Sequence, residues 1–322
     1  MGRLAHDTDN YLYGKGRLYF KKENTAGFID FGNVPKLEIT PEITKVDHFS
    51  SRSGTKLKDL SVVTESKMTV NFDIEEYSAA NINIAFLGDG EKDSTQSASS
   101  VSGAAITVAQ DLFVDLGKLN ISSVKLTHGA NTGGAFAAGE LVTGATSHAT
   151  GRVQWKGTGF IELNDVTGTF SSSEVIASGG KSATTTNAQV MEDIIVTDNA
   201  SAPTKRYVAG TDYDVDVQAG FFRSLEDGTI TTTAYVSYDY ALVTKETIQA
   251  LTNTEIKGEL MFIGDPDTGP KWKINMWTVS LSITSAVGFI SDDITPISMT
   301  GDILADTANH PSTPFFDAIR IG

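Results

Sequence analysis

Hydrophobic and polar residues alternate over a long run near the end of the chain, KWKINMWTVSLSIT at 271–284. Trp272 and Ile274 hold alternate positions at its start, and the alternation changes parity before Val279. Because successive side chains of a strand point to opposite faces of a sheet, the run predicts one long strand with a buried face and a wet face. The change of parity predicts one extra residue in the ladder, a β-bulge that we place at Met276–Trp277.

Two further alternating segments predict an antiparallel ribbon. Val34–Thr40 and Met68–Ile74 each alternate apolar and polar positions, as expected of two paired strands that bury one face. A polar segment at 45–61 separates them and is locally basic in an acidic chain; its charged residues are Lys45, Asp47, His48, Arg52, Lys56, Lys58 and Asp59. This segment is either a solvated turn or an arm that docks on an acidic surface, and its length favours the arm, because a tight hairpin needs fewer residues.

Two helices are predicted as well. From Glu75 to Leu87 the apolar spacing lengthens to that of a helix, and Ser78 stands where an N-cap is needed. A second segment, Lys245–Thr252, carries Ile248 at helical spacing. The small polar run DSTQSASSVSGAA at 93–105 has little to bury and predicts a linker or a surface loop.

An internal repeat lies in the middle of the chain. The run GAFAAGELVTGATSHATG aligns with the later run GTFSSSEVIASGGKSATT, so that Phe136 matches Phe170 and Glu140 matches Glu174. Two such copies predict a small duplicated β unit. The predicted division has two parts, a core with a middle β section at 1–127 and 191–322 and an insertion, on the outer surface, at 128–190.

Short strands are predicted through the rest of the chain. Apolar and polar residues alternate there between turn-forming residues, which is typical of a mainly β fold. These strands are expected near Leu18–Phe20, Ala105–Val108, Ser123–Leu126, Ile194–Thr197, Tyr213–Val217, Thr232–Tyr240, Glu259–Ile263, Ile294–Leu304 and Phe315–Ile321.

Composition narrows the class of protein. The 322 residues are 40% hydrophobic, enough for one large β domain or two ordinary ones. Cysteine is absent, which excludes disulfides and zinc–thiolate sites. The net charge of −15 argues against tight binding of nucleic acid, because phosphate binding needs concentrated Lys and Arg. The first ten residues lack the apolar core of a signal peptide and no run reaches the length of a membrane span, so we expect a soluble protein that is not exported by the usual route.

Residues that could support catalysis or metal binding are sparse. The zinc-protease, serine-hydrolase and P-loop motifs are missing, and the five histidines, from His6 to His310, are scattered. Asp212, Asp214 and Asp216 come nearest to a metal loop, but an EF-hand would need glycine and glutamate at two later places that hold other residues. On a strand these aspartates share one face, which favours a solvated acidic face. We therefore expect no catalytic residue, metal or cofactor.

Three stretches of the chain share an order of strands and loops with a known family. YGKGRLYFKKENTAGFIDFGNVPKLEIT continues through the basic segment and the first predicted helix to LGDG; VAGTDYDVDVQAGFFRSLEDG follows; GELMFIGDPDTGPKWKINMWTVSLSITSAVGFI and PISMTGDILAD come last. In this order they resemble the major tail tube proteins of tailed bacteriophages, over Tyr11–Thr127 and Met191–Ile321. The resemblance is one of order and extent, since it contains no catalytic signature.

The resemblance implies a tail-tube β-sandwich or barrel with a short flanking α-helix, a long inter-ring hairpin loop and an inserted small β unit. Copies would join side by side into hexameric rings that stack as a tube, and the segment at 45–61 would reach to the adjacent ring. Three strands would line the lumen, Val34–Thr40, Lys67–Ile74 and Lys271–Thr284. Their candidate lumen residues are Lys36, Glu38, Lys67, Thr69, Asn71, Asp73, Lys271, Lys273 and Asn275.

The same resemblance implies where the protein acts and with what. It would belong to the virion after assembly in the host cytoplasm, with partners that are other copies of itself, a tape measure protein, and distal tail and tail terminator proteins. Phage DNA would be present only in transit through the lumen, and the chain would not insert into a membrane. The size of the insertion favours a long non-contractile tail of the siphovirus type, because a sheath leaves little room for outgrowths.

Two other functions remain open. The duplicated segment and the aromatic residues Trp155 and Phe160 are compatible with a carbohydrate-binding or adhesin-like surface protein. A metal-dependent enzyme that uses the aspartates from Asp212 onward is the weaker alternative, and activity unaffected by a chelator would remove it.

Overall fold

The chain divides into two units that are described separately here. A computed structural model describes residues 11–12, 14–52 and 54–321. Unit 1 comprises Met1–Asp93 and Glu246–Gly322, and unit 2 comprises Ser94–Lys245. Antiparallel sheets dominate the described residues, so the mainly β class predicted from the sequence is confirmed. His6 and the N-terminal stretch tested for a signal peptide lie outside the described residues.

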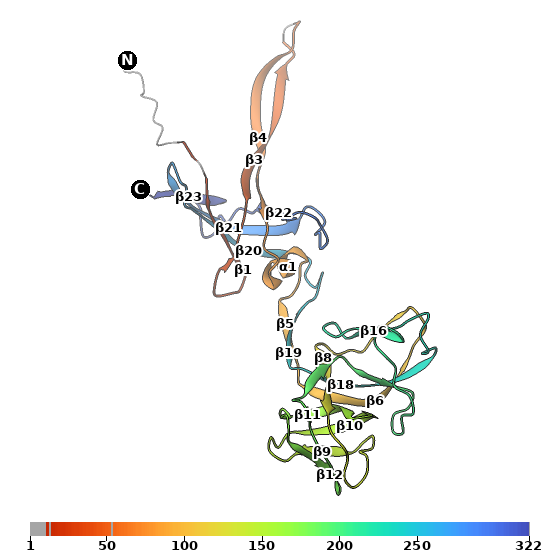
Figure 1. The fold of residues 1–322 in the computed structure, drawn as a ribbon. Coiled ribbons are helices and arrows are strands. Elements are labelled where there is room, and N and C mark those ends of the chain that lie inside the picture. Colours follow the sequence, from red (N-terminus) through yellow and green to blue (C-terminus); the bar gives the residue numbers. More distant parts are fainter. Residues whose placement is uncertain (1–10, 13, 53, 322) are drawn as a thin grey trace. The chain divides into compact units, whose positions relative to one another are not determined.

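Unit 1 is built on an antiparallel sheet with the strand order β2-β1-β20-β21-β22-β4-β3, in which β23 also pairs with β21 (Figure 1). The long strand predicted from 271 to 284 is β21 and lies in the middle of this order. The strands are β1 (Gly16–Lys22), β2 (Ile29–Asp30), β3 (Lys36–Ser50), β4 (Leu57–Ile74), β20 (Ile256–Gly264), β21 (Lys271–Ile283), β22 (Ile297–Ile303) and β23 (Phe316–Ile321).

One face of this sheet forms the core of unit 1. Phe20, Phe31 and Phe72 are fully buried and their rings contact in sequence, with centroids 6.0 and 5.4 Å apart. The helix α1 (Ala79–Ala85) adds Ile84 to the same cluster. As predicted, Ser78 caps this helix, and its side chain accepts a hydrogen bond from the backbone N–H of Asn81 at 3.2 Å.

The bulge in β21 lies one residue later than predicted. Gly258 of β20 stands opposite Val279, whereas Leu260 stands opposite Met276. Two residues of β21, Trp277 and Thr278, therefore face the single residue Glu259 of β20. The predicted position was Met276–Trp277. An extra residue kinks a strand and redirects its side chains; here Trp277 stacks on the ring of His310 with a centroid distance of 3.6 Å.

Unit 2 contains a larger sheet and a smaller one, and the predicted strands at 105–108, 123–126, 194–197, 213–217 and 232–240 are all present in them. The larger sheet has the order β13-β12-β9-β10-β11-β8-β18-β15, with β14 paired to β8 and β6 paired to β18. Its strands are β6 (Ser99–Thr107), β8 (Ile121–Thr127), β9 (Leu141–Gly144), β10 (Thr150–Gly157), β11 (Phe160–Thr167), β12 (Val175–Ser178), β13 (Lys181–Thr184), β14 (Val190–Glu192), β15 (Ile195–Thr197) and β18 (Thr233–Tyr240). The smaller sheet has the order β16-β17-β7, from β7 (Phe113–Asp115), β16 (Tyr213–Asp216) and β17 (Phe221–Ser224).

Two sequence expectations about the connections are corrected. The helix predicted at Lys245–Thr252 is wrong, because β19 (Val243–Ile248) occupies that segment and pairs with β5 (Glu91–Gln96). The loop predicted at 93–105 is strand over most of its length, in β5 and β6. The chain divides into compact units at 93/94 and 245/246, and the segment 128–190 lies within unit 2, where the strands on either side of it share the larger sheet; its origin as an insertion stays a prediction.

The internal repeat is structural. Its strands β9 and β12 pair with each other, and Phe136 and Phe170 are buried in one cluster. Glu140 accepts a hydrogen bond from the N–H of Ala137 at 3.0 Å, and Glu174 does the same for the N–H three residues before it, at 2.5 Å. Each copy therefore uses its glutamate to close the turn that follows its buried phenylalanine.

Candidate assembly surfaces

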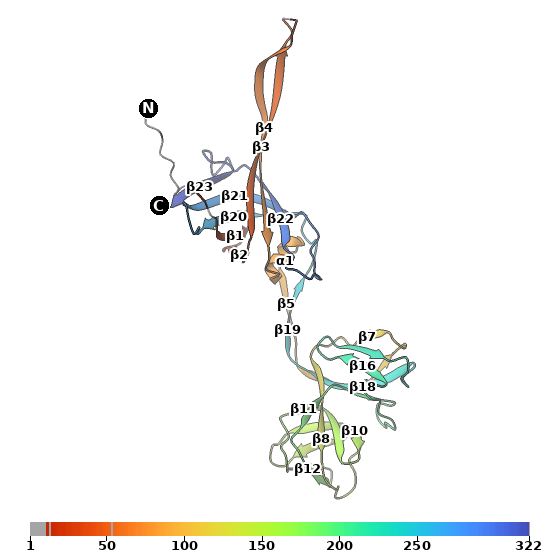
Figure 2. The same ribbon diagram turned by 45° about the horizontal axis from the view of Figure 1, so that its top comes forward.

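The ribbon of β3 and β4 continues far beyond the sheet. β22 pairs with β4 only over Met68–Ile74, whereas β3 and β4 pair with each other up to Ser50 and Leu57 (Figures 1 and 2). Residues 41–50 and 57–67 therefore form a two-stranded ribbon without further strands in the described part of the chain, here named the free ribbon. The sequence predicted a polar hairpin loop at 45–61, and most of that segment is paired strand.

Large apolar side chains lie exposed on the free ribbon. Between 48% and 61% of the surface of each remains accessible in Ile43, Val46, Phe49, Leu57, Leu60, Val62 and Val63. A two-stranded ribbon alone is marginally stable in water, and exposed apolar strands are association sites. Sequence reasoning missed these residues because the charges of the segment stood out more than its apolar positions.

The charged residues of the segment at 45–61 lie together on this ribbon. Lys58 Nζ is 2.7 Å from Asp47 Oδ1, and this hydrogen bond, with one from Ser61, holds the pKa of Asp47 below its usual value. His48 and Asp59 are joined at 2.6 Å. Both carboxylates of the segment are therefore already paired on the ribbon. The remaining cations are exposed and have no ion pair with described residues: Lys45, Arg52 and Lys56.

The candidate lumen residues lie on the face of the sheet opposite the core. Lys36 pairs across the ladder with Asp73, and Glu38 with Asn71, so these four share that polar face. Thr69 of β4 and Lys271 and Lys273 of β21 have the same parity, and Lys67 continues the face along the free ribbon. Asn275 has this parity too but is only 7% exposed, whereas the sequence predicted a solvent-exposed side chain. It stands opposite Asp317 of β23 in the ladder and donates a hydrogen bond to that carboxylate at 2.8 Å.

Charges of both signs share the polar face. Lys36 Nζ lies 3.1 Å from Glu38, and Lys21 of β1 lies 3.8 Å from Glu259 of β20. Lys271 is 2.7 Å from Asp265 in the turn before it. The face therefore offers no unbroken positive surface to a polyanion.

The sheet has open edges at two of its longer strands, in addition to the two-residue strand β2. Within the described residues, no strand pairs with the outer edge of β3 or of β23. Ile319 and Ile321 on β23 are exposed as well. An unpaired, partly apolar edge is a template for another strand.

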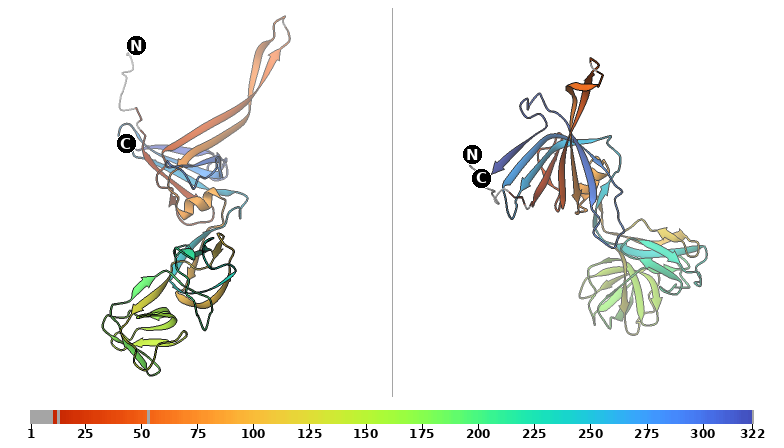
Figure 3. Two further views of the ribbon diagram at one scale, coloured as in Figure 1. Left: turned by 45° about the vertical axis from the view of Figure 1, so that its right-hand side comes forward. Right: turned by 90° about the horizontal axis from the view of Figure 1, so that it is seen from above.

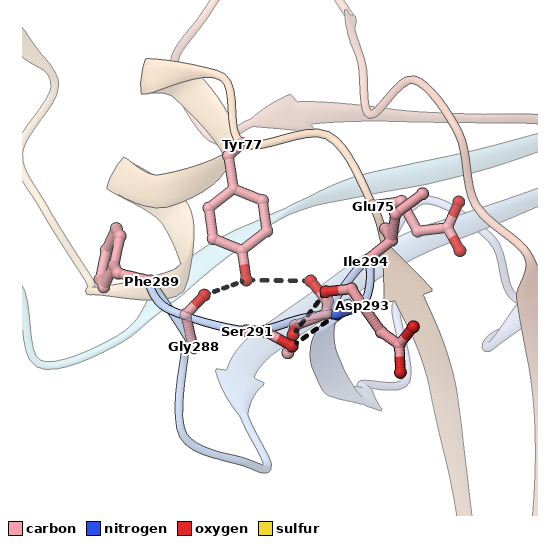
Figure 4. Close-up of a pocket in the computed structure, with 8 residues that line it drawn as sticks. Glu75, Tyr77, Gly288, Phe289, Ser291, Asp293 and Ile294 are labelled. Atoms are coloured by element: carbon pink, nitrogen blue, oxygen red, sulfur yellow. Dashed lines mark hydrogen bonds between the residues drawn. The ribbon is translucent and has the colours of Figure 1, made fainter.

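The loop between β21 and β22 presents a further apolar surface (Figure 4). Tyr77 Oη lies 3.0 Å from the carbonyl oxygens of both Gly288 and Thr295 and ties the loop to the segment before α1. The ring of Phe289 packs edge-on against Tyr77 at 6.0 Å. A shallow cavity of about 280 Å³ lies here, lined by Glu75, Tyr77, Gly288, Phe289, Ser291, Asp293, Ile294 and Thr295. Sequence reasoning missed the exposed apolar residues of this loop, whose run GFISDDI combines them with acidic ones.

The aspartates considered for metal binding each have another role. Asp212 is buried and accepts hydrogen bonds from the N–H groups of Val208 and Thr229. Asp214 faces Arg223 at 3.3 Å, and Asp216 accepts the N–H groups of the turn that follows β16. In the described part of the chain, no three His, Cys, Asp or Glu side chains come together as metal ligands would. The same residues contain no helix with the length and apolar composition of a membrane span.

A family model matches residues 11–159 and 162–315, with the description "Protein of unknown function UCP028589". The chain belongs to this family. No curated protein matches the sequence. The matched residues include those of the free ribbon, of the repeat in unit 2, and of every strand of the unit 1 sheet except β23.

Proposed function

We propose that the protein is a structural subunit that polymerises into a tube, the major tail tube protein of a tailed bacteriophage. The observation that carries this proposal is the free ribbon, whose apolar side chains are exposed in one copy and need another to cover them. The order of strands and loops in the sequence, which resembles that family, agrees with it.

In the proposed assembly the open edges of β3 and β23 pair with neighbouring copies and close a hexameric ring. Closure of the ring pairs the exposed sheet edges and so removes their tendency to bind other strands. The polar face of unit 1 then lines the lumen, where its mixture of cations and carboxylates lets DNA pass without sticking. The free ribbon spans to the next ring, and each interface would exceed roughly 2,000 Å².

The remaining parts of the proposal follow from the same family resemblance. The partners are further copies of the chain, a tape measure protein, and distal tail and tail terminator proteins, and the site of action is the virion of a siphovirus-type phage. The protein is proposed to have no enzymatic activity. Nothing in this role requires a cofactor.

Negative-stain electron microscopy of the purified full chain over a range of concentrations tests the proposal. Rings or stacked tubes of uniform diameter are expected. A chain that stays monomeric at every concentration, and also when mixed with a lysate of phage-infected cells that contains tail initiators, would contradict it.

A second function is favoured by a groove in unit 2. A cavity of about 520 Å³ is lined by Ala137, Ala138, Gln154, Trp155, Lys156 and Ser201–Thr204. An indole beside amide, hydroxyl and ammonium groups is a surface on which a sugar ring can stack and form hydrogen bonds. Phe160, the other aromatic residue considered, does not line this groove and instead lies under Lys125 at 4.7 Å. Binding of the full chain to a glycan array, lost in Trp155→Ala, would support a carbohydrate-binding role.

A further inference from the structure

Exposed apolar residues and carboxylates lie next to one another on the loop between β21 and β22. Ile290 is 99% exposed, and Phe289 and Ile294 are 67% and 75% exposed. Asp292 and Asp293 stand between them and are exposed too. These five residues, with Glu75 at the rim of the cavity in Figure 4, are here named the acidic loop surface.

The acidic loop surface is held in place. Besides the hydrogen-bond contacts of Tyr77 with the two ends of the loop, Phe289 stacks on Phe86 after α1 at 6.4 Å and 10° between ring planes. Asp293 donates its N–H to the hydroxyl of Ser291 at 3.1 Å. A surface fixed in this way can bind a partner with little loss of conformational entropy.

The free ribbon carries the complementary charge. Its segment 45–61, here named the ribbon tip, has four Lys and Arg residues against two Asp, whereas the loop segment 285–296 has two Asp and neither Lys nor Arg. Both aspartates of the ribbon tip are already paired on the ribbon, to Lys58 and His48. Uncompensated cations beside exposed apolar side chains are what an acidic apolar surface would bind.

The two surfaces lie at opposite ends of unit 1. The ribbon tip projects from one end, and α1 with the loop lies at the other, as Figures 1 and 2 and the left view of Figure 3 show. They cannot meet within one copy. Complementary patches at opposite ends of one body give a head-to-tail contact, which repeats without closing and builds a stack.

We propose that the ribbon tip of one copy docks on the acidic loop surface of a second copy. Leu57 and Leu60 of the ribbon tip, which share one face of the ribbon, supply the apolar contact to Phe289, Ile290 and Ile294. The exposed cations of the ribbon tip, Arg52 and Lys56 among them, face Asp292, Asp293 and Glu75. This inference rests on the proposed function, for which it identifies the receiving surface between successive rings.

Cross-linking between two single-cysteine chains tests the docking. Because the native sequence contains no cysteine, only the introduced thiols can react. Full-length Leu57→Cys is mixed with full-length Ile290→Cys and treated with a short bis-maleimide. Docking raises the local concentration of the two thiols, so the heterodimer yield should exceed that of a matched control by about tenfold or more. The control replaces Ile290→Cys by Leu112→Cys, an exposed leucine of unit 2.

Charge reversal identifies the contact more closely. Adding Asp292→Lys and Asp293→Lys to the Ile290→Cys chain should reduce the yield about tenfold, and Arg52→Glu with Lys56→Glu in the other chain should restore it. The yield of the unreversed pair should also fall as salt is raised.

Electron microscopy of the same preparations separates the two proposals. A yield equal to the control in samples that contain rings or tubes would overturn the docking and leave the tube function standing. A yield equal to the control, without rings or tubes even after a lysate with tail initiators is added, would overturn both. A yield above the control that does not change on charge reversal would also overturn the docking as described, because the acidic loop surface would then not be the surface that binds the ribbon tip.

Discussion

The exposed apolar residues of the free ribbon allow a direct test of whether this surface drives assembly. Leu60 and Val62 are suited to it, because they stand opposite His48 and Val46 and therefore share one face of the ribbon. Both are about half exposed, at 56% and 48%. Replacing both by serine removes apolar surface without opening a cavity in the core.

The expected loss of contact energy can be worked out from these exposures. Fully burying a leucine or valine is worth about 1.5–3 kcal/mol, and about half of that remains to be gained where half of the side chain is still exposed. The double substitution should therefore weaken each contact by about 2 kcal/mol, or roughly thirtyfold. The folded monomer should change by no more than about 0.5 kcal/mol, because both side chains lie on the surface.

Pelleting of assembled protein over a concentration series measures this effect as the critical concentration for assembly. Thermal unfolding followed by circular dichroism checks that the monomer is intact. Leu112→Ser with Val208→Ser, two exposed residues of unit 2, is the matched control and should leave the critical concentration unchanged. If the ribbon variant assembles at the same concentration as the control, the free ribbon does not carry the contact and the reasoning is refuted.

Four other outcomes are expected. Burial alone would raise the pKa of Glu174, but hydrogen bonds from backbone N–H groups outweigh it and hold that pKa low. Glu174→Gln should cost unit 2 about 2 kcal/mol by urea unfolding at neutral pH. The difference should shrink as the pH falls below about 4.3, the ordinary pKa of glutamate, and vanish only below the lowered pKa of the folded protein. Arg206→Met should destabilise unit 2 by about 3–5 kcal/mol in thermal unfolding, since it leaves the carboxylate of Glu162, which is 3% exposed, without its cation. Glu162→Gln should cost less in the same measurement. Tyr77→Phe should speed amide exchange in the loop that Tyr77 holds by about fivefold, for a hydrogen bond worth about 1 kcal/mol, without changing global stability. Deleting 94–245 and joining the ends by a short glycine linker should leave the circular dichroism of unit 1 and its ring formation intact, because the buried cluster of unit 1 uses none of the deleted residues.

Alternation alone located most of unit 1. Strands such as β21 and β4 bury one face and expose the other to solvent, so buried and exposed positions alternate along the sequence with period two. The short helix α1 was found from Ser78, whose capping role is local. Even the bulge was found to within one residue, because an extra residue must change the parity.

The errors arose where partners distant in sequence decide the structure. The segment at Lys245–Thr252 has helical spacing but pairs with β5, some 150 residues earlier, and becomes β19. The run at 93–105 has little to bury on its own and gains its strand from the same kind of pairing. The exposed apolar residues of the free ribbon were overlooked because a single sequence does not tell which alternating positions lack a covering layer.

The two candidate functions depend on different units and are therefore compatible. The free ribbon, the open edges and the acidic loop surface all belong to unit 1, whereas the groove at Trp155 belongs to unit 2. Each unit has its own buried clusters, so a change in one groove or edge need not disturb the other unit. A chain built this way can assemble through unit 1 while unit 2 binds a ligand, and a variant at Trp155 that lost glycan binding but still formed tubes would separate the two functions.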